Sequence, residues 1–252
     1  MIEQHFIIGD KLDNEEHQYI DVIKAFISRE FHHILQNEKF EECIIFNDPN
    51  RQCPMFCNKI ENNMECNLIF LSAKSYNYWC QVIYQLSHEM THYFIYIINN
   101  NIQSKISWVE ESICEMMSLY FLQYFRDNWR ECELSKYNYT YDSEIDNYLQ
   151  KILNNRGEES LTKISDIEQL EEIDRLSEKD RGLRSYEVNR LFNFIKDYRD
   201  LEALLHYRNY SISNSVLLDS VKYMQKYKNN ELVKYLCSLQ QCCEEVAYEK
   251  NE

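Results

Sequence analysis

The sequence predicts a helix-rich α+β fold, on three observations. Only three glycines and two prolines occur among 252 residues, so few backbone breakers interrupt helices. Two short runs of β-branched and aromatic residues in the first half are typical of strands, and every periodic segment after residue 142 has helical spacing. We therefore expect two lobes, an α+β lobe over residues 1–130 and an all-helical lobe over 131–252.

The first lobe begins with an amphipathic helix over residues 15–36. Its apolar residues recur at helical spacing and share one face: Ile20, Ile23, Phe26, Ile27, Phe31, Ile34 and Leu35. Strands are predicted at 42–47 and 65–71, and apolar helices at 78–98 and 107–125. Ser107 is the expected N-cap of the last helix.

The second lobe consists of helical segments alone. A polar, tyrosine-rich stretch over 132–142 is the expected junction between the lobes. The predicted helices then cover residues 142–154, 164–176, 185–197, 201–207, 214–227 and 231–248.

Composition limits the classes of partner and the compartment. A net charge of −15 argues against nucleic-acid binding and against adhesion to anionic membranes. No apolar run is long enough to span a bilayer, and residues 1–5 lack the features of a signal peptide. We therefore expect a cytoplasmic protein whose ten cysteines are free thiols. A second zinc site at Cys53 and Cys57 is a weaker alternative, since their spacing is not a standard one.

The string His88-Glu89-Met90-Thr91-His92 has the pattern H-E-x-x-H within the helix predicted at 78–98. Residues four apart lie on one face of a helix, so both imidazoles can reach one zinc ion. Glu89 then lies beside the metal, where a general base is needed. The pattern predicts a zinc-dependent hydrolase, and two histidines packed in a buried helix are the alternative.

A catalytic zinc needs a third protein ligand, and Glu111 follows His92 by eighteen intervening residues on the next predicted helix. The two segments together resemble the gluzincin branch of zincin metallopeptidases, whose pattern is H-E-x-x-H, eighteen residues, then Glu. The string from Trp108 to Ser112 is similar to the W-L-x-E-G opening of the family's glutamate helix. Glu110 is the competing ligand if the loop register differs.

The resemblance implies further roles. A small sheet would pack on the metal-site helix, and its edge strand, expected at 67–72, would bind extended peptide. Glu115 would accept a hydrogen bond from His88. Tyr186 would stabilise the oxyanion, because its local string resembles a family helix that opens with tyrosine, and His206 is the second candidate.

The family's G-x-M-E-N segment, which anchors a free N-terminal amine in aminopeptidases, is absent from the sequence. We therefore expect a single-zinc endopeptidase that acts on a peptide or protein substrate. Two other classes stay open at this point. One is a catalytically silent zinc-binding module with a regulatory or interaction role, and the other is a helical interaction protein without metal.

Overall fold

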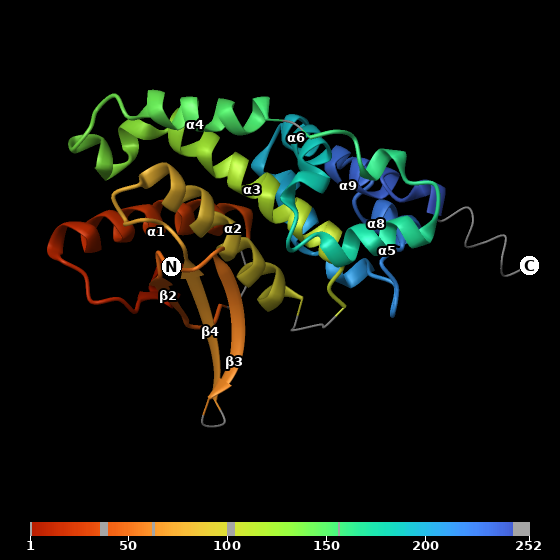
Figure 1. Cartoon of the computed structure of the whole chain (residues 1–252), viewed down its shortest axis with the longest axis horizontal. Helices are drawn as coiled ribbons and strands as arrows, with labels where there is room; N and C mark the ends of the chain where they lie inside the picture. The colour runs from red at the N-terminus through yellow and green to blue at the C-terminus, as the bar shows by residue number, and fades with distance from the viewer. Residues whose placement is uncertain (1, 36–39, 62–63, 100–103, 156, 244–252) are drawn as a thin grey trace, which may run out of the picture. The chain divides into compact units, whose positions relative to one another are not determined.

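The computed structural model describes residues 2–35, 40–61, 64–99, 104–155 and 157–243, and Figure 1 shows its course. It confirms the helix-rich α+β class. The chain divides into two compact units, each built from two stretches of sequence. Unit 1 comprises Met1–Ile97 and Met117–Ile152, and unit 2 comprises Ile98–Met116 and Leu153–Glu252.

Unit 1 contains a four-stranded mixed sheet with the strand order β1-β2-β4-β3. The strands are β1 (Phe6–Ile8), β2 (Cys43–Asn47), β3 (Met55–Glu61) and β4 (Met64–Leu71). β1, β2 and β4 are parallel to their neighbours in that order, whereas β3 pairs antiparallel with β4 along its full length. Figure 1 shows β3 and β4 as one long hairpin.

The prediction that residues 67–72 form the edge of the sheet is wrong. β4 is hydrogen-bonded on both sides, to β2 and to β3, so the edge strands are β1 and β3. Sequence analysis missed both of them. In the stretch that contains β3 the feature singled out is the cysteine pair Cys53 and Cys57, of which Cys57 alone lies in the strand, and the three residues of β1 are too few to show a period.

Aromatic side chains join this sheet to the helices α1 (Asn14–Ile34) and α2 (Trp79–Ile98). Phe6 of β1 and Phe56 of β3 both contact Tyr93 of α2, with ring centroids 5.1 and 5.9 Å apart. Phe31 of α1 packs on Phe94 of α2 at 4.2 Å. All but Phe56 are buried, so the core of unit 1 lies between one sheet face and these helices.

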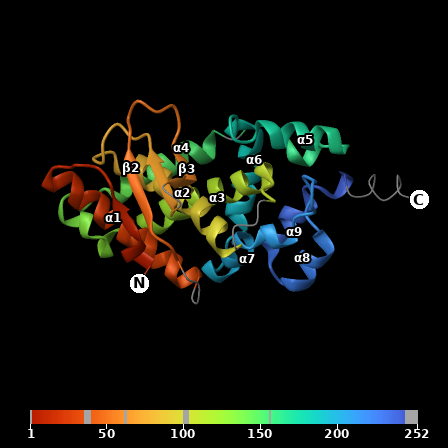
Figure 2. The ribbon, with the colours of Figure 1, turned by 90° about the horizontal axis from the view of Figure 1, so that it is seen from below.

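Unit 2 is helical, as predicted, although its helices are shorter than the sequence suggests. They are α5 (Ile167–Leu176), α6 (Ser185–Phe194), α7 (Leu201–Leu205), α8 (Ser220–Lys226) and α9 (Glu231–Ser238). Figure 2 shows α7, α8 and α9 beside one another. The predicted helix at 214–227 begins six residues late, because Asn214 has a left-handed backbone with φ of 57° and Ser211 bridges to Leu218. The last residues of the predicted helix 231–248 lie outside the described chain.

Short 3-10 helices connect these elements. They are η1 (Ile2–His5), η2 (Trp129–Glu131), η3 (Glu133–Lys136), η4 (Leu161–Lys163), η5 (Arg181–Arg184), η6 (Tyr198–Asp200) and η7 (Tyr207–Tyr210).

Helix α3 (Ser107–Asp127) is unbroken and contributes to both units. The helix starts at Ser107 itself, and the backbone N–H of Trp108 donates to Asp174 of α5 at 2.9 Å. Asp174 therefore accepts a hydrogen bond from one of the N–H groups that have no partner within the helix at this terminus. The sequence predicts Ser107 as the cap.

Helix α4 (Asp142–Asn154) has the bounds that the sequence predicts, but most of it belongs to unit 1. Arg126 of α3 pairs with Asp146 at 2.8 Å, and the ring of Tyr148 lies 6.3 Å from that of Tyr84 in α2. The lobe boundary suggested between residues 130 and 131 thus falls inside one of the two units.

Within the described chain, no helix combines the length and the apolar character needed to cross a bilayer. All ten cysteines are free thiols.

Candidate metal centre

His88 and His92 lie one turn apart near the middle of α2 and are 2% and 8% exposed. Their ring centroids are 5.0 Å apart. The hydroxyls of Ser87 and Thr91 donate to helix carbonyls four residues earlier, at 2.7 Å in each case. These two hydroxyls are therefore hydrogen-bonded within the helix and are not candidate metal ligands.

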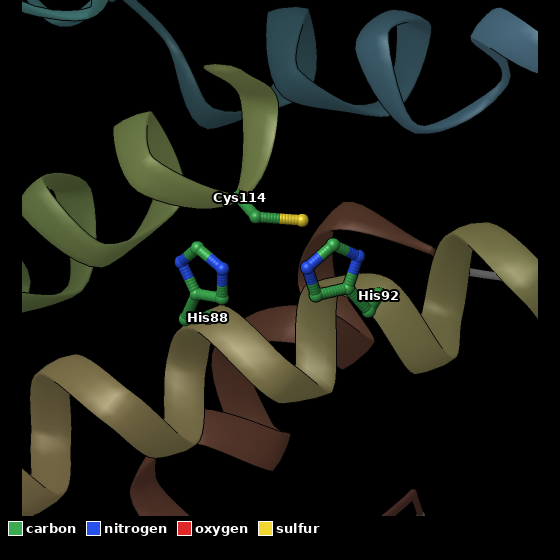
Figure 3. A group of neighbouring side chains, drawn as sticks. All are labelled: His88, His92 and Cys114. Atoms are coloured by element: carbon green, nitrogen blue, oxygen red, sulfur yellow. The ribbon is translucent and has the colours of Figure 1, made fainter. Parts of the chain in front are cut away.

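Cys114 of α3 is the third member of this centre, and Figure 3 shows its sulfur directed toward both imidazoles. One ligand atom from each of His88, His92 and Cys114 lies within 4.8 Å of the others. Cys114 is fully buried and precedes Met117 by less than one turn of the unbroken helix. Helix α3 runs without a break from Cys114 into residues 117–127.

These donors suit a zinc ion. Imidazole nitrogen and thiolate sulfur are its preferred ligands, and a tetrahedral ion holds such atoms roughly 3.3–3.6 Å apart. Side-chain adjustments of about 1 Å would bring the observed group to that spacing. Among the described residues the group has three donors, which is the number found in catalytic sites, where a fourth position stays open.

Glu89 is 2% exposed and follows the first histidine of the group on α2. It lies within electrostatic range of the edge strand β3. Burial raises the pKa of the Cys57 thiol in β3, Lys59 and Arg51 lower it, and the carboxylate of Glu89 raises it further.

Glu111 and Glu115 lie on α3 and are each 7% exposed, but the donor group includes neither of them. Lys105 Nζ is 3.6 Å from Glu111 Oε1, and Arg181 Nε is 3.0 Å from Glu115 Oε1. Burial lowers the pKa of Lys105, but Glu110, Glu111 and Glu178 raise it more, so the ammonium stays charged beside Glu111. The roles of Glu111 as a ligand and of Glu115 as an acceptor stay predictions.

Sequence analysis missed Cys114 because the resemblance directed attention to glutamate. A signal was present, since Cys114 lies three residues after Glu111 and therefore on the same face of the helix. A thiolate is also a better zinc ligand than a carboxylate in soft donor sets.

Glu110 has a different partner. Its Oε2 accepts hydrogen bonds from Tyr207 Oη at 2.5 Å, Arg208 Nη2 at 2.7 Å and Arg208 Nε at 2.9 Å, and all three side chains are buried. Burial and the Glu110 carboxylate raise the pKa of Tyr207 well above its ordinary value. The geometry gives Glu110 a structural role and removes support for it as the competing metal ligand.

We expect Arg208→Met to lower the free energy of unfolding by roughly 3–5 kcal/mol, because it leaves the Glu110 carboxylate buried without its counter-ion. Urea unfolding followed by circular dichroism measures the change. The matched control is Arg175→Met, which breaks the exposed ion pair with Glu172 and should change little. Equal stability of the two variants would contradict the role assigned to the buried pair.

The two oxyanion candidates lie in unit 2. Tyr186 is the second residue of α6, so it opens a helix as predicted, and it is partly exposed. His206 follows α7, and its Nε2 lies 3.9 Å from Glu202 Oε1. Which of them serves the centre stays a prediction.

Comparisons with protein-family models, with curated proteins and with solved structures find no match for this chain.

The third ligand can be identified with Co²⁺, which replaces zinc and reports thiolate ligands through a sulfur-to-metal charge-transfer band. If Cys114 ligates, the Co²⁺ complex of the protein should show that band, and Cys114→Ser should abolish it. If Glu111 ligates, Glu111→Gln should weaken metal affinity more than Cys114→Ser does, and the band should be absent from the start. Visible and near-ultraviolet absorption with a competition assay distinguishes the two outcomes.

Proposed function

We propose that this chain is a zinc-dependent peptidase that hydrolyses internal peptide bonds. The observation that carries the proposal is the convergence of His88, His92 and Cys114 on one buried point, with Glu89 next to the first histidine. This supports a metal site of the kind that H-E-x-x-H helices form. The resemblance to gluzincins supports the substrate class, and the absent G-x-M-E-N segment supports an endopeptidase.

In this proposal His88 and His92 hold the ion together with Cys114 or Glu111. Zinc bound there would lower the pKa of a water molecule and polarise the scissile carbonyl. The Glu89 carboxylate accepts the proton as water adds to the carbonyl carbon, and it returns that proton to the nitrogen when the C–N bond breaks. Tyr186, or alternatively His206, donates a hydrogen bond to the oxyanion. Glu115 orients the His88 ring.

The free edge of β3 is the proposed binding site for extended peptide. Among the described strands, β3 pairs with β4 alone, so its outer edge can accept an extended peptide by strand addition. Free thiols throughout the chain support a reducing compartment, and we place the activity in the cytoplasm.

A catalytically silent zinc module is the second candidate, and burial favours it. Cys114 and Glu89 are 0% and 2% exposed, and a buried thiolate ligand is typical of sites that hold structure together.

Metal analysis combined with cleavage profiling tests the proposal. Protein purified without chelator should contain one zinc per chain and should cleave a proteome-derived peptide library, with activity lost to a zinc chelator and restored by added zinc. Zinc without cleavage would establish the silent module. No zinc, either after purification or after addition, would refute both.

A further inference from the structure

Arg184 carries a fully buried guanidinium with two hydrogen-bond donors that have no acceptor. The residue ends η5 and is 0% exposed. Its Nη1 donates to the backbone carbonyl oxygens of Ser177 and Asp180, at 2.7 and 3.2 Å. These two bonds hold the guanidinium in one orientation. Within the described chain, its Nε and Nη2 donate to nothing.

Donors without an acceptor are rare in a protein interior, because an unpaired buried polar group has lost its water and gained nothing in exchange. The cost is larger for a charged group. A guanidinium also stays charged when it is buried, since it does not lose its proton in proteins. The two N–H groups of Arg184 therefore indicate an acceptor that another molecule supplies.

The chemistry of that acceptor follows from how this chain uses the same edge of other arginines. Nε and Nη2 lie side by side on one edge of the planar guanidinium and match the spacing of two carboxylate oxygens. In three other arginines both of these atoms donate to one carboxylate group. The pairs are Arg175 with Glu172, Arg199 with Asp197 and Arg208 with Glu110. A carboxylate is therefore the expected acceptor for Arg184.

The nearest carboxylates of the chain have cations of their own. Arg181 Nε lies 3.0 Å from Glu115 Oε1, and Lys105 Nζ lies 3.6 Å from Glu111 Oε1. Burial lowers the pKa of Arg184, and Glu111 and Glu115 oppose this shift, although neither accepts a hydrogen bond from its Nε or Nη2. Recognition at Arg184 therefore depends on the paired donors rather than on the net charge around them.

Arg184 projects from the side of η5 that contacts helix α3. Side chains three residues apart eclipse one another in a 3-10 helix, so Arg181 and Arg184 share one side of η5. Arg181 reaches Glu115, which follows Cys114 of the donor group directly in sequence. The Cys114 thiol also lies within electrostatic range of Arg184. All four residues belong to unit 2.

We propose that Arg184 binds a carboxylate group of the peptide substrate through its Nε and Nη2. The identity of the ligand as a substrate rests on the proposed function, whereas the preference for a carboxylate rests on the guanidinium alone. An acidic side chain and the C-terminus of a peptide both carry such a group. The burial of Arg184 shields the bond from water, which strengthens a charge-assisted hydrogen bond.

Peptide binding to the full chain that carries Glu89→Gln tests the proposal without turnover. The probes are fluorescein-labelled peptide pools of random sequence, in which one position at a time is fixed as glutamate or as glutamine. Each pool is made with an amidated and with a free C-terminus. At one fixed position or more, the amidated glutamate pool should bind roughly tenfold more tightly than its glutamine counterpart in fluorescence anisotropy. A preference for the free C-terminus instead identifies that group as the bound carboxylate.

Variants of Arg184 then assign the preference to this residue. Arg184→Gln should abolish it, and Arg184→Lys should keep only part of it, because lysine retains the charge without the paired donors. The matched control is Arg175→Gln, which removes the same edge from an exposed pair and should leave the preference unchanged. Circular dichroism checks folding, and Arg184→Lys decides the question if Arg184→Gln does not fold.

The outcomes separate this proposal from the peptidase proposal. Equal binding of glutamate, glutamine, amidated and free pools would overturn the carboxylate site, and so would a preference that both Arg184 variants retain in full. Cleavage of the pools by the unaltered chain would in that case leave the proposed function standing. Binding that depends on Arg184, without any cleavage by the unaltered chain, would establish the carboxylate site and refute the peptidase.

Discussion

Glu89→Gln is expected to retain its zinc and to lose peptide hydrolysis by roughly a hundred- to ten-thousandfold. The carboxylate is the proposed carrier of the proton between water and the leaving amine, and an amide of nearly the same shape can neither accept nor return it. Glutamine has nearly the same size as glutamate and therefore fits the position of Glu89, whose side chain is 2% exposed. The fold and the two histidines should be undisturbed.

Turnover of a peptide identified by cleavage profiling, together with zinc content, measures this effect. Glu144→Gln on α4 is the matched control, since Glu144 is exposed and has no proposed role. Unchanged turnover in Glu89→Gln would refute the peptidase mechanism while leaving the metal site intact. Loss of zinc together with activity would assign Glu89 to metal binding.

His88→Ala and His92→Ala are each expected to lower zinc affinity by more than about a hundredfold. Removing a group that merely orients a ligand already costs ten- to a hundredfold, and removing the ligand itself should cost more. Each variant leaves only two members of the donor group. Isothermal titration with zinc, or competition with a chromogenic chelator, measures the loss.

His32→Ala is the control for these two variants, because His32 is exposed on α1. It should bind zinc like the unaltered chain. If all three variants bind zinc equally, the ion is held elsewhere, and the donor group on α2 and α3 is a packed pair of histidines beside a thiol.

Local patterns in the sequence predict much of this fold. Helix α4 has its predicted bounds, and α2 and α3 start and end within two residues of theirs, because a continuous helical period depends on neighbours along the chain. Strand order depends on distant partners. The alternation in residues 65–71 predicts a strand but not whether β4 lies at the centre or the edge of the sheet.

The same distinction applies to the site. The spacing of His88 and His92 is local, and the structure places both in one donor group. The third donor comes from another helix, and its identity depends on the rotation of α3 about its axis. Glu110, Glu111 and Cys114 lie within little more than one turn, and their different partners, Arg208, Lys105 and the two histidines, follow from that rotation. A sequence motif does not encode the rotation of a helix about its axis.

The helix shared by the two units bears on how this protein can have been assembled in evolution. Neither unit is a contiguous module, because residues 98–116 of one interrupt the other in sequence. A recombination breakpoint at residue 130 would transplant α3 without Asp174, Tyr207 and Arg208. The helix would then lack its N-terminal acceptor, and the buried Glu110 would lack its counter-ion. The two units are therefore expected to be inherited together, and the interleaved chain constrains domain shuffling.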